Sequence, residues 1–171
     1  MTLWDQAYHV KGSSALKIIQ LSNNKMFKVG DEDFFFFDRY IDVIECAAII
    51  GFKRYNDPEK YQEALRNYID EDKESDIEVP IKTILKESKK LKFLFRVIVL
   101  NENVSGKTLK EKTDGAFREG DGTPTMAFNE TLFNNFVKLG VDIIYDCVIG
   151  IKDAPSCLDI MADILEMKVN E

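Results

Sequence analysis

The sequence predicts a mainly α-helical fold, a compact domain of about six helices. Apolar residues recur at three- and four-residue spacing over long stretches, which is the period of an amphipathic helix. Capping residues or prolines stand just before several of these stretches. The 171 residues, 45% of them hydrophobic, suit one domain with its own core. No internal repeat or Gly/Ser-rich linker divides them, so we expect residues 1–171 to form a single helical domain.

The N-terminal region gives the weakest pattern. Ser13 and Ser14 can cap a short helix over 15–21. A turn is expected at Gly30-Asp31, after a polar stretch that would end this helix. The aromatic run 34–37 is too short for its period to separate a strand from the lead-in to a helix.

Two helices follow with clearer signals. The first is expected to begin after an N-cap at Asp38 and to stop at Gly51, and its small residues Ala47 and Ala48 indicate close packing. The second is expected to run to about residue 68, because Asp57-Pro58-Glu59 combines a cap with proline at the first helical position.

The segment 70–78 holds six acidic residues against the single base Lys73. Such a composition favours an exposed loop. It is interpreted either as a solvated linker or as an acidic segment that docks onto a basic partner.

Pro80 is expected to start an amphipathic helix with a basic face. Its apolar side is predicted to hold Ile77, Ile81, Ile84, Leu85, Ser88, Leu91 and Phe95, and its basic side Lys82, Lys86, Lys89 and Lys90. The apolar run 93–100 either continues this helix or forms a strand, and in the second case a short strand pair near 27–37 and 93–100 is expected.

The C-terminal half alternates between helices and turns. A helix is expected over about 107–118, and a turn-rich stretch over 120–124. Asn129 is expected to cap a long helix, and Gly140 either ends this helix or is tolerated inside it. A last helix is predicted over about 155–167.

Charge and composition limit the function classes. The net charge of −7 argues against a protein whose whole surface binds nucleic acid, since phosphate binding requires concentrated positive charge. No apolar run approaches the roughly 20 residues of a membrane-spanning helix, and the first residues lack the basic and apolar regions of a secretory leader. We therefore expect a cytoplasmic protein with no membrane partner.

Residues able to carry chemistry are few. Cys46, Cys147 and Cys157 lie among apolar neighbours without a CxxC spacing, and His9 is the only histidine, so no metal site and no cofactor are expected. Asp and Glu are abundant, yet no pair of them is singled out as an acid and base. The sequence thus predicts no catalytic residue and no enzyme activity.

One near-motif stands out. Ser105 and the following Gly106, Lys107 and Thr108 resemble the end of a phosphate-binding loop between an apolar run and a helix. The complete loop needs a glycine five positions before Gly106, and Asn101 occupies that place. A nucleotide-binding enzyme that uses the degenerate segment stays as an alternative function.

Two groups of residues are candidates for partner binding. A helix can present lysines along one ridge to an acidic protein or to a phosphate backbone, and the protein partner is favoured because arginines and interleaved aromatic residues are absent from that face. Large aromatic side chains often anchor interfaces. The candidate partner-binding residues are Trp4, Phe34, Phe35, Phe36, Lys82, Lys86, Lys89 and Lys90.

Four segments in order carry a family resemblance: 40–54, 79–82, 95–100 and 132–141. They resemble the small accessory proteins encoded beside DNA phosphorothioation (Dnd) and related phage-defence systems. In those proteins a helix ending in Ala-Ala-x-x-Gly-Phe/Tyr precedes a Pro-led segment, an apolar run and a last helix closed by glycine. The pattern is also similar to the small middle subunits that accompany ABC-type or SMC-like ATPases in Lamassu-like three-component systems.

The resemblance implies an all-helical accessory subunit that docks onto a larger ATPase or nuclease of an antiviral defence complex, with at most an indirect or weak DNA contact. It transfers no catalytic residue. A second hypothesis is an acidic inhibitor or DNA mimic that occupies a basic groove of a nucleic-acid enzyme, with 70–78 as part of the mimicry.

Overall fold

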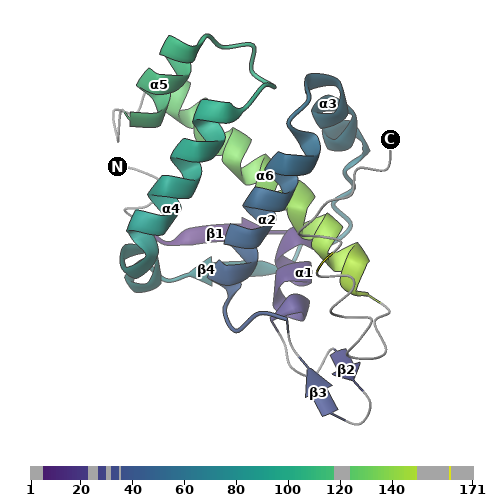
Figure 1. Cartoon of the computed structure of the whole chain (residues 1–171). Helices are drawn as coiled ribbons and strands as arrows, with labels where there is room; N and C mark the ends of the chain where they lie inside the picture. Colours follow the sequence, from purple (N-terminus) through teal and green to yellow (C-terminus); the bar gives the residue numbers. More distant parts are fainter. Residues whose placement is uncertain are drawn as a thin grey trace.

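The computed structural model describes residues 6–22, 27–29, 32–34, 36–117, 124–149 and 162. Within them the chain forms six helices and two short antiparallel sheets (Figure 1). This confirms the predicted mainly α-helical fold. None of the described helices combines the length and the apolar character that crossing a membrane requires.

The centre of the fold is the crossing of α2 (Tyr40–Tyr55) and α6 (Pro124–Val148), the most extensive contact among the described elements. A Cβ added at Gly140 would stand 1.9 Å from the carbonyl oxygen of Ala47, and one added at Gly51 would stand 2.0 Å from that of Phe136. The two helices touch backbone to backbone, which confirms the close packing expected at Ala47.

The glycines therefore do not end helices here. Gly51 was expected to stop the first long helix, but α2 continues to Tyr55 because Gly51 keeps a helical backbone and provides the space for α6. Gly140 lies inside α6 for the same reason. Of the two alternatives left open for Gly140, tolerance inside the helix is confirmed.

Two shorter helices flank the crossing. α1 (Ser13–Leu21) begins after Gly12, so the two serines lie inside it rather than capping it. α3 (Pro58–Asn67) begins as expected, since the carboxylate of Asp57 accepts the backbone N–H groups of residues 59 and 60. Tyr61 of α3 packs its ring 5.3 Å from that of Phe136 and anchors α3 on α6.

α4 (Ile81–Asn101) and α5 (Leu109–Phe117) pack together on one side of the molecule (Figure 1). Residues 93–100 are helical, so the strand alternative for them is wrong. A short strand pair does form within 27–37, but its two strands pair with each other. The side chains at 94, 95, 98 and 99 are buried, and the ring of Phe95 lies 5.8 Å from that of Phe133 on α6. Burial of these side chains in the core stabilises residues 93–100 as part of the helix.

The sheet that reaches the core joins β1 (Tyr8–Lys11) to β4 (Asp76–Val79), antiparallel. Ile77 was expected on the helix after Pro80 but lies in β4, where it is buried. The side chains alternate, so the inner face holds Tyr8, Val10, Ile77 and Val79. Neither strand was predicted, since each has only four residues and its partner lies far away in the sequence.

The second sheet is a hairpin of β2 (Phe27–Val29) and β3 (Glu32–Phe34), which pair only with each other. It lies at the end of the molecule farthest from α5 in Figure 1. The expected turn at Gly30-Asp31 falls outside the described residues, as does the expected helix over 155–167 except for residue 162, which is helical.

Two further predicted caps are wrong. α2 has its N-cap at Arg39, one residue after Asp38. α6 begins at Pro124, so Asn129 lies within its second turn, buried at 2% exposure. Asn129 was mistaken for a cap because asparagine is typical there, whereas here its amide oxygen accepts a hydrogen bond from the Nζ of Lys107.

Candidate protein-interaction surface

Six residues of α4 form an exposed strip that we call the outer surface of α4. It consists of Ile81, Lys82, Leu85, Lys86, Lys89 and Phe93. At 3.6 residues per turn these positions fall within about 140° of the helix circumference. The opposite side of α4 is buried against α2, α5 and α6. One helix thus carries two apolar stripes, and only one of them is covered.

The large apolar side chains on this surface are well exposed. Ile81 is 45% exposed, Leu85 is 56% exposed and Phe93 is 69% exposed. Ile81 and Leu85 were expected on the buried side with Ile84, and that expectation is wrong. The buried stripe passes through Ile84 and Leu91, and the apolar residues outside it face solvent.

The predicted basic face divides into two kinds of lysine. Lys90 binds the carboxylate of Glu45, whose side chain is only 6% exposed. Lys90 therefore has a structural role, because it neutralises a buried charge. Lys82, Lys86 and Lys89 are exposed and make no hydrogen bond or ion pair with any described residue. Three positive charges are therefore available on the outer surface of α4.

The apolar character continues onto α5. The guanidinium of Arg96 stacks 5.0 Å from the ring centre of Phe117, which is itself 55% exposed. Leu109, at the start of α5, is 72% exposed. Because Arg96 lies one turn beyond Phe93 on α4, the exposed rings of Phe93 and Phe117 belong to adjacent parts of one face.

The aromatic residues predicted for partner binding lie elsewhere. Trp4 and Phe35 fall outside the described residues, and Phe34 ends β3. Phe36 is partly buried against the core, so its ring contributes to packing. The sequence did not single out Phe93, and the signal that could have found it is its place on the helical ridge of Leu85 and Lys89.

The near-motif for phosphate binding follows a helix, α4, rather than a strand. Gly106 adopts a positive φ of 68°, and Lys107 turns inward so that its Nζ lies 4.0 Å from the ring centre of Phe128. Burial lowers the pKa of Lys107. Thr108 and Glu111 form reciprocal hydrogen bonds at the start of α5, the pattern of a capping box. The side chains of Lys107 and Thr108 thus bind residues of their own chain rather than pointing to a free phosphate site.

The loop before the near-motif is held by a buried carboxylate. Glu102 is 1% exposed and accepts hydrogen bonds from the backbone N–H and the hydroxyl of Ser105. Lys112 of α5 donates to the backbone oxygen of Glu102 and lies 3.8 Å from its carboxylate. The segment therefore connects α4 to α5 as a fixed turn.

The acidic segment is more structured than a solvated linker. Asp70 accepts the backbone N–H of Ser13 at 2.7 Å, and this bond lowers the pKa of Asp70. Asp72 accepts the N–H groups of residues 74 and 75 and the hydroxyl of Ser75. Residues 76–79 are β4, so the expectation of a loop through residue 78 is wrong.

The lone histidine lies on the outer face of the same sheet. The two ring nitrogens of His9 stand 3.8 Å from the carboxylate of Asp76 and 3.9 Å from that of Glu78, and all three side chains are about half exposed. No Ser or Cys hydroxyl or thiol is recorded as its partner among the described residues. The arrangement is an exposed cluster of a histidine and two carboxylates across paired strands rather than a nucleophile with its base.

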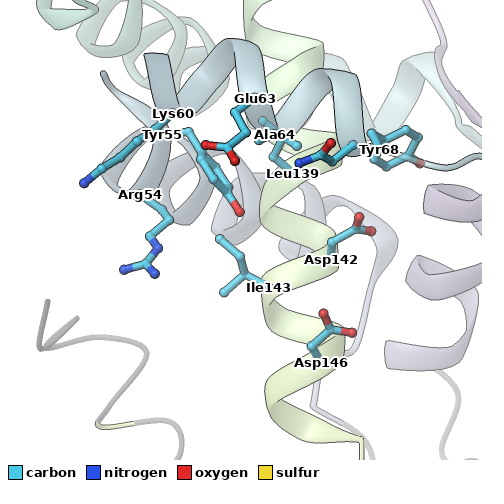
Figure 2. Close-up of a pocket in the computed structure, with 11 residues that line it drawn as sticks. Arg54, Tyr55, Lys60, Glu63, Ala64, Tyr68, Leu139, Asp142, Ile143 and Asp146 are labelled. Carbon is cyan, nitrogen blue, oxygen red and sulfur yellow. The ribbon is translucent and has the colours of Figure 1, made fainter. Parts of the chain in front are cut away.

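A pocket of about 470 Å³ lies between α3 and the C-terminal half of α6 (Figure 2). Its lining residues are Arg54, Tyr55, Lys60, Glu63, Ala64, Asn67, Tyr68, Leu139, Asp142, Ile143 and Asp146. Figure 2 shows Asp142 and Asp146 one turn apart on α6, with Arg54 and Lys60 on the other side of the opening. Opposite charges thus stand on opposite walls.

Part of that charge is already neutralised. Lys17 of α1, which does not line the pocket, binds the carboxylate of Asp142 at 2.8 Å. Burial raises the pKa of Asp142, and the hydrogen bond from Lys17 opposes that shift. In the described part of the chain, no three His, Cys, Asp or Glu side chains gather closely enough to hold a metal ion.

Comparisons with protein-family models, with curated proteins and with solved structures found no match to this chain.

Proposed function

We propose that this chain is a non-catalytic accessory subunit that docks onto a larger protein through the outer surface of α4. The observation that carries the proposal is the exposure of Ile81, Leu85 and Phe93 along one side of a helix whose other side is fully packed. Clusters of exposed large apolar side chains on a folded domain are typical of interaction sites.

Covering these side chains would supply useful binding free energy. Fully burying a Leu, Ile or Phe side chain is worth about 1.5–3 kcal/mol. Since each of the three is roughly half exposed, covering each one would contribute on the order of 1 kcal/mol. Phe93 is the most exposed of the three and the only aromatic one, and aromatic residues are frequent interface anchors, so we expect Phe93 to be the central contact.

The resemblance described above indicates which partner to test first. It favours a larger ATPase or nuclease subunit of an antiviral defence complex in the cytoplasm. The net charge of −7 supports a protein partner over direct binding of DNA by the whole surface.

The experiment is co-purification of the tagged chain with the products of its neighbouring genes, expressed together. A Leu85→Ser/Phe93→Ser variant should lose partners that the wild-type chain retains. Ile69→Ser is the matched control, because Ile69 is 72% exposed but lies beyond the end of α3. Each variant is first checked for an unchanged melting temperature.

Retention of partners by the wild-type and control chains, with loss in the double variant, would support docking through α4. A wild-type chain that stays monomeric beside all of its neighbours would refute the proposal. Equal retention by both variants would place the interface elsewhere.

A further inference from the structure

We infer that the element which docks on α4 is an acidic amphipathic helix of the partner, aligned along Ile81–Phe93. This inference depends on the proposed function, and it adds the chemistry and shape of the partner's contact. Three features of the outer surface of α4 carry it: its ridges, its unpaired charges and its length.

The apolar side chains and one lysine form a single ridge. Ile81, Leu85, Lys89 and Phe93 are spaced by four residues each, and side chains at such spacing stand above one another along a helix. Ridges of this kind pack into the groove between the corresponding ridges of a second helix, at interaxial distances of about 8–10 Å. The outer surface of α4 therefore has the relief that a helix accommodates.

The lysines on this surface indicate which charged groups the partner helix carries beside its own apolar residues. Lys82 and Lys86 form a second ridge directly beside the apolar one, and Lys89 interrupts the apolar one. None of the three forms a hydrogen bond or an ion pair with a described residue, and Lys86 acts on Glu87 only at longer range, where Arg39 is the main partner. A partner helix that covers Leu85 and Phe93 must place groups next to these lysines, and carboxylates are the complementary choice.

The length of the strip fits a short helix. From Ile81 to Phe93 the chain advances twelve residues, about 18 Å at 1.5 Å per residue. A partner helix of about four turns covers that distance. α4 lies at one side of the molecule, beside α2, so that its outer surface is not covered by the other described elements (Figure 1).

Nucleic acid fits the same surface less well. Ile81 and Leu85 are aliphatic and cannot stack on bases, and placing phosphates beside them would cover apolar groups with charge. The stacking position of Arg96 is already taken by Phe117. The overall charge of −7 further repels a polyanion, whereas a short acidic helix carries few charges and brings its own apolar face.

The test uses two synthetic helical peptides of about four turns with the same leucine seam. One has glutamates beside the seam, and the other has lysines at the same positions. Each is titrated into the isotopically labelled full chain, followed by NMR, and a duplex DNA of equal length is the third probe. We expect amide shifts confined to α4 and its neighbour α5 with the glutamate peptide, and binding at least tenfold weaker with the lysine peptide and with DNA.

Charge reversal on the protein provides the decisive comparison. Lys82→Glu/Lys86→Glu should weaken the glutamate peptide at least tenfold and strengthen the lysine peptide. Arg66→Glu/Lys73→Glu makes the same change in net charge at two exposed positions away from α4 and should alter neither. Raising the salt concentration should weaken the glutamate peptide, since exposed charge pairs are screened.

Three results would overturn the inference: equal binding of both peptides, DNA binding that competes with the glutamate peptide, or no shifts at about 1 mM peptide. Co-purification separates this inference from the proposed function. If Leu85→Ser/Phe93→Ser loses the partner but Lys82→Glu/Lys86→Glu retains it, docking through α4 stands and the acidic partner helix is refuted. If both variants retain the partner, both proposals fall.

Discussion

Replacing Gly140 with alanine adds one methyl group at the point where α2 and α6 touch. The new Cβ would stand 1.9 Å from the carbonyl oxygen of Ala47, and ordinary contacts of a Cβ begin at 3.4 Å. The helices would have to separate by about 1.5 Å at their crossing, the difference between those two distances. Because the obstacle is backbone, no change of rotamer can relieve it.

The cost follows from two opposing effects. Overpacking a well-packed core destabilises by about 1–3 kcal/mol, and the rigid obstacle places this site at the upper end. Alanine is favoured over glycine inside a helix by about 1 kcal/mol. We expect a net loss of about 2 kcal/mol in the free energy of unfolding, which lowers the melting temperature by roughly 4–8 °C for a chain of this size.

Urea unfolding followed by circular dichroism measures this loss, together with thermal unfolding. Thr131→Ala is the control on the same helix, since Thr131 is exposed and, among the described residues, its hydroxyl binds the carbonyl of Ala127 one turn away. A substitution at such a site usually changes stability by less than about 0.5 kcal/mol. Stability of Gly140→Ala equal to the wild type would refute the close approach.

Two double variants test whether contact between the backbones causes the loss of stability in Gly140→Ala. Ala47→Gly/Gly140→Ala removes the Ala47 methyl but leaves its carbonyl in place, so the double variant should remain destabilised. Recovery of wild-type stability would mean that side chains, not backbones, meet at the crossing. Gly51→Ala/Gly140→Ala should cost less than the sum of the two single changes, because one separation of the helices relieves both clashes.

Two further predictions concern Asp70 and the near-motif. Asp70→Ala should destabilise the chain at pH 7 by about 1 kcal/mol, the size of a lost helix cap. The pKa of Asp70 is lowered in the folded state. The stabilisation by Asp70 is therefore complete above the ordinary carboxyl pKa and disappears as the pH falls through the lowered pKa. Urea unfolding at pH 7 and at acidic pH measures the difference, and an equal loss at both would contradict the role of the charge. Millimolar ATP or GTP should leave the melting temperature unchanged because Lys107 and Thr108 bind groups of their own chain, and a rise of several degrees would instead support the nucleotide site.

The helices were predictable because their signals are local. The cap at Asp57 and the proline after it fix the start of α3 within four residues of sequence. The small residues of α2 indicated close packing before any partner was known. Even so, Gly51 was misinterpreted as a stop, since a glycine that ends a helix and one that admits a second helix look alike in sequence.

The strands and the site depended on distant contacts. β1 and β4 pair across more than sixty residues, and four-residue segments carry too little periodic signal to be found alone. Lys90 and Lys86 look equivalent along α4, yet only Lys90 has a buried carboxylate beside it, contributed by α2. The difference between a structural lysine and an available one lies outside the helix that carries both.

By itself the sequence determined the class of fold and most helix positions, because apolar period and capping act between residues a turn apart. It also limited the function by its acidic charge and its incomplete phosphate-binding motif. Only the tertiary structure decided which apolar stripe of α4 is covered, since α4 carries more apolar surface than α2, α5 and α6 can contact. The proposed function depends on the uncovered remainder, which holds Ile81, Leu85 and Phe93. Beside them stand three lysines that form no ion pair with any residue the structure describes.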